Sequence, residues 1–170
     1  MAGASLLGGP ALAAELVKAP QRTLAFANLR TGETVRATYW EAGAGYVKDA
    51  VAALNKALRD GRTGDVHPMD PRLLDLMAAV NAKVGALAPI EVICGYRSPK
   101  TNAMLAAKSG EVAKHSLHMD GKAVDIRVKG VELRHLQKAA LSLRVGGVGL
   151  YPVSNFVHMD VGPVRTWQGT

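Results

Sequence analysis

Two residues near the middle of the chain, His118 and Asp125, have the side chains of a metal site. A histidine nitrogen and a carboxylate oxygen are both ligands that zinc accepts. Gly121 lies between them and allows the backbone to turn tightly. In the strand predicted after this turn, Asp125 falls on the face opposite Val124 and Ile126, so it can point into a cleft while the apolar face packs on a core. Two ligands do not hold a metal, so the pattern predicts a third one elsewhere.

His158 is the best candidate for that third ligand. The segment 156–161 alternates as a strand, which puts His158 and Asp160 on one face. A histidine and a carboxylate two positions apart on a strand face can both reach one metal ion or its bound water. His118, Asp125 and His158 therefore form a predicted set of three ligands with an open fourth position, which is the pattern of catalytic zinc sites.

Three other residues with metal-binding side chains are interpreted differently. Cys94 is the only cysteine, so it cannot form an intrachain disulfide, and its place at the end of the apolar run 90–94 predicts a buried strand residue. His67 precedes a proline in a loop and has no partner at ligand spacing. His135 lies among charged neighbours in a predicted helix, so we expect it to be solvated.

The net charge of +7, from 21 basic and 14 acidic side chains, favours polyanionic surroundings such as nucleic acid, an anionic membrane or an acidic wall polymer. The basic residues are scattered and only two Phe are present, which argues against a nucleic-acid function. At 170 residues, with 48% hydrophobic and 21% charged residues, the chain suits one folded domain.

The remaining pattern predicts the elements that must position these side chains. A hairpin of two strands comes first, at 23–29 and 34–40. Apolar residues at helical spacing predict helices over 46–59, from Pro71 to Leu87, over 99–108 with Ser98 as N-cap, and over 131–143. Strands are predicted at 90–94, 123–128, 145–151 and 156–161, and the tail 162–170 carries no predicted element. Strands and helices are mixed without strict alternation, which indicates an α+β fold.

Residues 1–14 are uncharged, apolar and small, and the alanines at 11, 13 and 14 look like a cleavage site. No positively charged segment precedes them. We favour a truncated signal segment, which implies export, over a flexible apolar terminus. The run is too short, and too interrupted by Gly8, Gly9 and Pro10, to span a bilayer.

Four motifs together carry a resemblance to a known family. They are Gly95-Tyr96-Arg97-Ser98-Pro99-Lys100-Thr101-Asn102, the run Ser116 to Asp125, Gly147-Val148-Gly149, and the run Val157 to Trp167. Over residues 20–168 the chain resembles the DUF882 (YcbK/MepK-like) branch of the M15-type zinc peptidases. It is similar to the wider group that contains D-Ala-D-Ala peptidases, MepA-type murein endopeptidases and the hedgehog domain.

The resemblance implies one zinc ion per chain and an α+β fold with a central antiparallel sheet flanked by helices, after an N-terminal β-hairpin. It implies a periplasmic or exported murein endopeptidase that hydrolyses peptide crosslinks of peptidoglycan, with diaminopimelate-containing links suggested by this branch. Peptidoglycan stem peptides are then the expected partner, with no nucleic acid and no membrane span. The alternative is a non-catalytic, metal-bearing module that binds cell wall or another polyanion.

The resemblance carries His118 and Asp125 over as zinc ligands. Relatives often end in the motif His-x-His, whereas the corresponding run in this chain is His158-Met159-Asp160. We therefore expect His158 to bind the metal and Asp160 to act as the general base; the swapped assignment, with Asp160 on zinc, stays open. His115 is the alternative base.

On the substrate side, Arg97 resembles the family's arginine. We expect it to stabilise the developing oxyanion or to bind a substrate carboxylate, and its alternative role is a structural salt bridge. Ser98, Ser116 and His115 are the other expected substrate contacts. Ser98 could instead only cap a helix, and Ser116 could support the site from behind.

Overall fold

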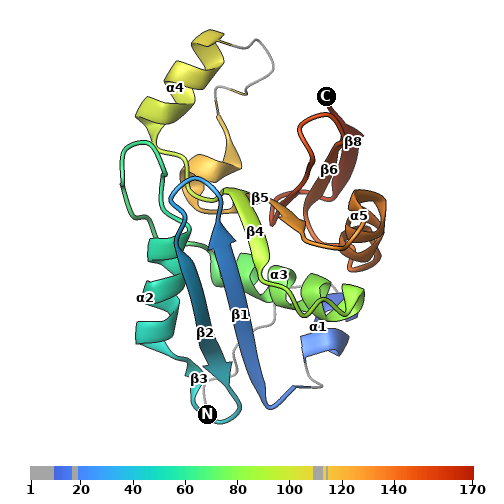
Figure 1. The fold of residues 1–170 in the computed structure, drawn as a ribbon. Helices are drawn as coiled ribbons and strands as arrows, with labels where there is room; N and C mark the ends of the chain where they lie inside the picture. The colour runs from blue at the N-terminus through green and yellow to red at the C-terminus, as the bar shows by residue number, and fades with distance from the viewer. Residues whose placement is uncertain (1–9, 17–18, 109–112, 114) are drawn as a thin grey trace.

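The computed structural model describes residues 10–16, 19–108, 113 and 115–170. Its strands are β1 (Gln21–Asn28), β2 (Thr34–Glu41), β3 (Gly45–Tyr46), β4 (Ile90–Cys94), β5 (Ala123–Val128), β6 (Gly147–Tyr151), β7 (Phe156–Asp160) and β8 (Arg165–Gln168). Its helices are α1 (Pro10–Leu16), α2 (Lys48–Ala57), α3 (Pro71–Val84), α4 (Pro99–Lys108), the 3₁₀ turn η1 (Leu117–Asp120) and α5 (Leu133–Ser142). Figure 1 shows their arrangement.

The described strands join one eight-stranded sheet in the order β3-β2-β1-β4-β5-β7-β6-β8. Most neighbours are antiparallel, but β1 pairs with β4 and β6 pairs with β8 in parallel. The predicted α+β class and the opening hairpin of β1 and β2 are confirmed. The sheet itself is mixed rather than wholly antiparallel, because β4 joins β1 only after the intervening elements β2 to α3, and β8 joins β6 only after the chain has reversed through β7.

The two faces of the central strands have different roles. Val124 and Ile126 of β5 and Val157 and Met159 of β7 are all buried in the core. Helix α5 packs against β5, β6 and β7, and also against α3, which contacts β1. Since side chains alternate along a strand, Asp125 must project from the sheet face opposite this apolar layer. The sheet thus separates the core from the candidate site.

Helix α3 begins and ends where its sequence predicts caps. The Asp70 side chain accepts a hydrogen bond from the Arg72 N–H at 2.9 Å, and Pro71 takes the first helical position. Gly85 adopts the left-handed conformation with φ of 63° and ends the helix. The prediction that the helix continues to Leu87 is therefore wrong, and the Leu87 side chain is 100% exposed.

Two short strands are absent from the prediction, β3 and the C-terminal β8 in the tail. The predicted leader also differs in part: residues 1–9 lie outside the described residues, but residues 10–16 form α1, which packs on α3. Leu12 and Leu16 of α1 are buried in the same core as the rest of the chain. The folded unit therefore includes residues before the predicted domain start at 20. Within the described residues, no helix has the length and apolar character needed to cross a membrane.

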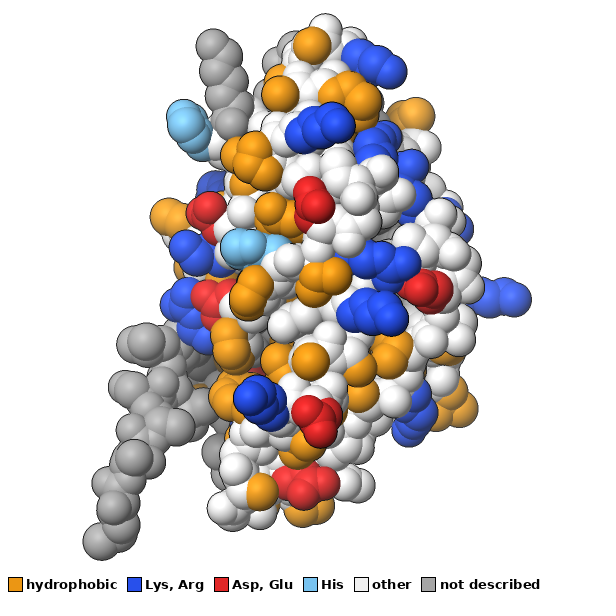
Figure 2. All heavy atoms as spheres, turned by 90° about the vertical axis from the view of Figure 1, so that its left-hand side faces the viewer, with side chains coloured by type: hydrophobic (Ala, Val, Ile, Leu, Met, Phe, Trp, Pro, Cys, Tyr) orange, Lys and Arg blue, Asp and Glu red, His pale blue; other side chains and the backbone are white. Residues whose placement is uncertain are grey.

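Charge is spread over the face of the molecule that Figure 2 shows, rather than gathered in one patch. Lys and Arg side chains alternate there with hydrophobic and acidic ones. This agrees with the scattered basic residues in the sequence.

Candidate metal centre

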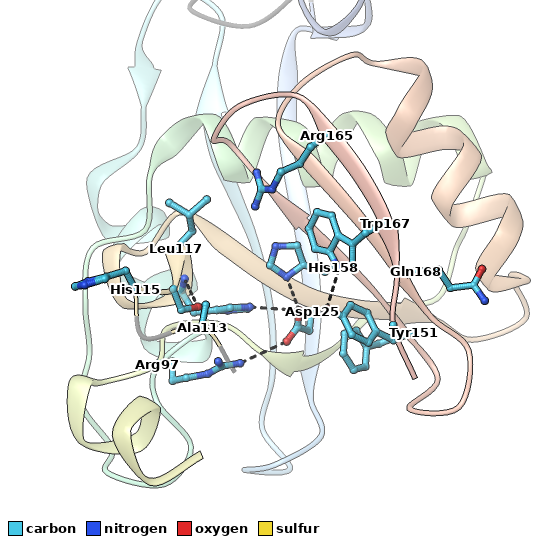
Figure 3. A pocket seen from close by; sticks show the side chains of 14 residues that line it. Arg97, Ala113, His115, Leu117, Asp125, Tyr151, His158, Arg165, Trp167 and Gln168 are labelled. Atoms are coloured by element: carbon cyan, nitrogen blue, oxygen red, sulfur yellow. Dashed lines mark hydrogen bonds and ion pairs between the residues drawn. The ribbon is translucent and has the colours of Figure 1, made fainter. Parts of the chain in front are cut away.

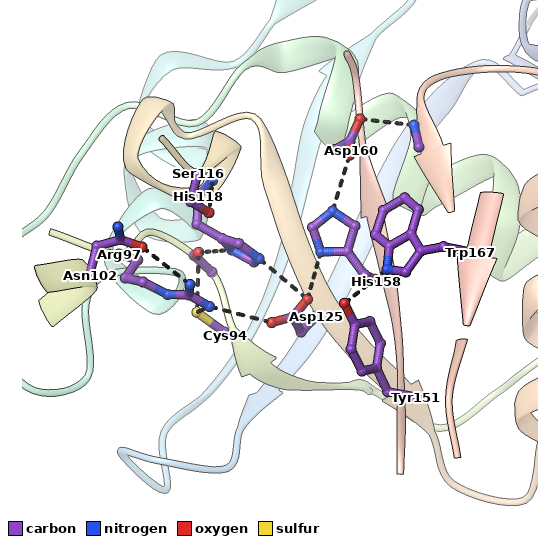
Figure 4. Close-up of polar contacts among 12 residues, drawn as sticks. Cys94, Arg97, Asn102, Ser116, His118, Asp125, Tyr151, His158, Asp160 and Trp167 are labelled. Carbon is purple, nitrogen blue, oxygen red and sulfur yellow. Dashed lines mark hydrogen bonds and ion pairs between the residues drawn. The ribbon is translucent and has the colours of Figure 1, made fainter. Parts of the chain in front are cut away.

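Asp125 lies between two histidines on the open face of the sheet. Its Oδ1 atom is 3.3 Å from Nε2 of His118 and 2.8 Å from Nδ1 of His158. The sheet register places His158 of β7 directly opposite Asp125 of β5. His118 comes from η1, and the chain then turns at Gly121, where φ is 65° and a Cβ atom would lie 2.4 Å from the Pro68 carbonyl oxygen. Both predicted histidine ligands therefore approach the same oxygen of the predicted aspartate ligand, as Figure 4 shows.

The outer nitrogens of both histidines face groups that accept hydrogen bonds. His118 Nδ1 lies 2.8 Å from the Gly95 carbonyl oxygen, and His158 Nε2 lies 3.0 Å from Asp160 Oδ2. A carbonyl and an ionised carboxylate cannot donate, so the outer nitrogens carry the protons. The inner nitrogens both face the Asp125 carboxylate, which can only accept, so either a proton or a metal ion must lie between them. Two ring nitrogens and one carboxylate oxygen are a donor set that fits a divalent metal.

The charges of the cluster show the same preference. Burial lowers the pKa of His118, but the charges of and hydrogen bonds to Asp125 and Cys94 together raise that pKa well above its usual value. Burial raises the pKa of Asp125, but the charge of His118 and the hydrogen bonds from both histidines lower it overall. The buried site therefore stabilises positive charge beside a permanent carboxylate.

Asp160 lies behind His158 and is fully buried. Burial alone would raise its pKa, but hydrogen bonds from His158, from the backbone N–H groups of Gly147 and Gly162 and from Arg165 lower the pKa to about 2. The oxygens of Asp160 are thus already engaged by His158, Arg165 and two backbone N–H groups. This geometry weighs against the expected general-base role of Asp160 and against the swapped assignment on the metal.

Arg97 is held beside the cluster by a sharp turn after β4. The turn is anchored by the buried Asp60, whose Oδ2 accepts from the Ser98 N–H at 2.8 Å, and by the Leu58 carbonyl, which accepts from the Tyr96 N–H at 2.7 Å. The Arg97 Nη2 atom lies 3.8 Å from Asp125 Oδ2. The end of α2 therefore fixes both the guanidinium and the neighbouring Gly95 carbonyl that binds His118.

Cys94 lies closer to the site than its sequence position suggested. It is opposite Asp125 in the register of β4 and β5, and one ligand atom each from Cys94, His118 and Asp125 lie within 4.8 Å of one another. The Cys94 Sγ atom, however, accepts a hydrogen bond from Arg97 Nη2 at 3.6 Å. A cation bound at Sγ would adjoin that guanidinium, whereas one on the His158 side faces the open pocket.

Replacing Cys94 with serine is expected to leave zinc content and turnover unchanged, because the serine hydroxyl keeps an acceptor for Arg97 and no ligand is lost. Zinc per chain, measured by mass spectrometry of the metal, and hydrolysis of a defined crosslinked substrate check this. His158→Ala is the paired variant and is expected to lose the metal. The reverse outcome, in which Cys94→Ser loses zinc and His158→Ala keeps it, would assign Cys94 as the third ligand.

A pocket of about 530 Å³ opens over the cluster, within the range of small-molecule sites. Figure 3 shows its two sides around Asp125 and His158. A polar side carries Arg97, His115 and Ser116, and an aromatic side carries Tyr151, Phe156 and Trp167. Trp167 Nε1 donates to the Tyr151 hydroxyl at 2.8 Å, which fixes this wall.

The structure brings most of the predicted site residues to this pocket. His115 and Ser116 line it, and the Ser116 hydroxyl also accepts from the His118 N–H at 3.4 Å. Ser98 is not among the lining residues: it is buried, and its hydroxyl accepts from the Thr101 N–H at 3.2 Å as the cap of α4. The expected substrate contact of Ser98 is therefore contradicted, and its capping alternative describes it.

Sequence reasoning assigned no role to Arg165, Trp167 and Tyr151, which also line the pocket. Arg165 and Trp167 lie in a recognised tail motif, but a motif alone does not reveal which side chains face the site. A strand prediction for the tail would have placed both beside β6, since β8 pairs Gly147 with Arg165 and Gly149 with Trp167.

Comparisons with known proteins cover nearly the whole chain. A family model described as peptidoglycan L,D-endopeptidase MepK matches residues 17–167. The peptidoglycan L,D-endopeptidase MepK of Escherichia coli K12 is 44% identical over 165 residues, which is 97% of this chain and 90% of that protein. A probable peptidoglycan L,D-endopeptidase MepK of Haemophilus influenzae is 46% identical over 169 residues, 98% of this chain and 89% of that protein.

One solved structure is also similar in part. It is the L-Ala D-Glu endopeptidase ChiX of Serratia marcescens, which matches with a TM-score of 0.36 and 21% identity over 45% of this chain and 59% of that one.

Proposed function

The chain belongs to the MepK family of peptidoglycan L,D-endopeptidases, and we propose that it hydrolyses peptide crosslinks of peptidoglycan at one zinc ion held by His118, Asp125 and His158. Diaminopimelate-containing links are the proposed target. The working place of such an enzyme is outside the cytoplasm, so we propose an exported, periplasmic protein.

One observation carries the metal assignment: the inner nitrogens of the buried His118 and the partly buried His158 converge on one carboxylate oxygen, at 3.3 and 2.8 Å, while their outer nitrogens face acceptors. Two nitrogens and one carboxylate oxygen beside an open pocket make the three-ligand arrangement of catalytic zinc sites. A zinc ion bound there would polarise a carbonyl group and lower the pKa of a bound water to about 7.

The chain's own residues supply the rest of the chemistry. Arg97, fixed by the turn at 95–98 and facing the pocket, is placed to stabilise negative charge that develops on the scissile carbonyl oxygen. The two candidate bases are Asp160 and His115. His115 is among the residues that line the pocket, and Asp160 is not. We therefore assign proton transfer to His115.

The two sides of the pocket fit a crosslinked stem peptide. Such peptides carry free carboxylates and aliphatic side chains. Arg97 and His115 offer charged or polar contacts on one side, and Tyr151, Phe156 and Trp167 offer an apolar wall on the other. A peptide laid across Asp125 would contact both sides at once.

Digestion of purified crosslinked muropeptides tests the function. We expect new peptide amines and monomeric products, detected by mass spectrometry, with the wild-type protein. A chelator should stop the reaction, and zinc added at about one equivalent per chain should restore it.

His118→Ala is the matched negative control, because it removes one ligand from a turn that stays capped by Ser116. Wall hydrolysis at the wild-type rate by His118→Ala would overturn the metal site. Stoichiometric zinc binding without any cleavage of crosslinked or linear muropeptides would instead favour the non-catalytic, wall-binding alternative.

A further inference from the structure

The Asp160 carboxylate is surrounded by donors. Its Oδ1 atom accepts from the backbone N–H groups of Gly147 at 2.8 Å and Gly162 at 2.9 Å, and from Arg165 Nη1 at 3.2 Å. Its Oδ2 atom accepts from Arg165 Nη2 at 2.7 Å and faces His158 Nε2 at 3.0 Å. A carboxylate has about four lone-pair sites, so these contacts fill it. An acceptor this fully engaged has no free electron pair turned toward the substrate pocket.

The strand beside Asp160 has glycines where this ion pair needs space. A Cβ atom on Gly147 would lie 2.6 Å from both Asp160 Oδ2 and Arg165 Nη1. Gly146 has φ of 63°, and its Cβ would lie 1.6 Å from the Asp160 carbonyl oxygen. A side chain at Gly147 would therefore collide with the Asp160–Arg165 pair, and one at Gly146 would collide with the Asp160 backbone, so both glycines are needed for this close approach.

The bidentate pair with Arg165 fixes the plane of the Asp160 carboxylate. A metal bound at Nδ1, the nitrogen that faces Asp125 at 2.8 Å, would need the lone pair of that nitrogen. The ring proton then has to be on Nε2, where the Asp160 oxygen at 3.0 Å accepts it. Asp160 thereby selects both the orientation and the tautomer of the third ligand.

We propose that Asp160 and Arg165 are positioning residues that hold His158 in its metal-binding form, and that Asp160 is not the general base. This inference rests on the proposed function, since it takes His158 as a metal ligand. Arg165 acts through Asp160, because its guanidinium contacts the carboxylate and not the histidine.

Asp160→Asn gives the sharpest test. Two backbone N–H groups at Oδ1 require the amide oxygen on that side, so the amide nitrogen turns toward His158 Nε2 and donates to it. The proton of His158 then moves to Nδ1 and blocks the metal. We expect zinc affinity, measured by competition with a chromophoric chelator, to fall about 10- to 100-fold. In ¹⁵N-histidine-labelled protein at a zinc concentration that saturates only the wild type, the Nε2 proton signal of His158 should be present in the wild type and absent in the variant.

Turnover separates positioning from base catalysis. If Asp160 acts through His158, part of the lost turnover returns when zinc saturates the variant. A general base predicts the opposite: wild-type zinc affinity, an unchanged Nε2 proton signal, and a turnover loss that saturating zinc does not relieve. That result would overturn the inference. If the wild-type protein itself binds no zinc or cleaves no crosslink, the proposed function fails instead.

Arg165→Met is the second variant, and it carries the test if Asp160→Asn does not fold. We expect a smaller loss of zinc affinity, several-fold, because the carboxylate stays but loses its anchor; unchanged affinity would overturn the role of Arg165. Glu91→Gln is the matched control. It breaks another carboxylate–arginine pair on the same sheet, with Arg127, away from the pocket, and is expected to keep wild-type affinity and turnover.

Discussion

Asp125→Asn is expected to abolish both zinc binding and hydrolysis. The substitution keeps the size of the side chain, but it replaces the charged oxygen between His118 and His158 with a neutral amide. Loss of the anionic ligand should cost more than the about 100-fold that loss of an outer hydrogen-bond partner costs. Zinc per chain and the turnover of a crosslinked muropeptide, measured on the same preparation, check the result.

The fold should survive this change. Asp125 projects from the sheet face opposite the apolar core, so its replacement by an amide of the same size leaves the core packing unchanged. Circular dichroism of the metal-free variant should match that of the metal-free wild type. Asp49→Asn, an exposed aspartate on α2, serves as the control and should behave as wild type. Normal hydrolysis by Asp125→Asn would exclude this carboxylate as a ligand.

Arg97→Gln is expected to lower kcat by about 100- to 1,000-fold while zinc stays bound, the range seen when one donor to a developing oxyanion is removed. Its guanidinium approaches Asp125 Oδ2 only to 3.8 Å, so it supports the ligand weakly and remains available to the substrate. Steady-state kinetics with zinc in excess give kcat and KM separately.

The KM value decides between the two substrate roles of Arg97. A higher KM with kcat retained would indicate binding of a substrate carboxylate, and a lower kcat would indicate stabilisation of the oxyanion. Arg36→Gln, an exposed arginine on β2, is the matched control. Lower thermal stability with both kinetic constants unchanged would leave Arg97 with only a structural salt bridge.

Local signals predicted much of the fold. The Asp70–Pro71 pair and Ser98 mark helix starts through hydrogen bonds made within three residues, so they are readable without the tertiary structure. The predicted end of α3 lies beyond the observed one because Leu87 continues the apolar periodicity of the helix past Gly85, the residue that ends it. Strand β8 has the sequence Arg-Thr-Trp-Gln, which shows no apolar alternation. Its pairing with β6 is what makes it a strand.

The candidate site, like the fold, was predictable only where the signal is local in the sequence. His118, Asp125 and His158 could be selected because ligand chemistry and strand alternation are visible in the sequence, and the structure brings them together. The role of Asp160 could not, since alternation places it on the face of His158 but does not show that backbone and arginine donors surround it. The neighbourhood of Cys94 depends on the register between β4 and β5, which no local pattern reveals.

The order of the ligands along the chain has a consequence for biosynthesis. A chain made from its N-terminus presents His118 and Asp125 first, in η1 and β5, and acquires His158 and its support from β7 and β8 only afterwards. With the proposed ligand set, the site has two of its three ligands until those strands pair. On this proposal the endopeptidase would be inactive as an unfinished chain and would become active only once its last strands have docked.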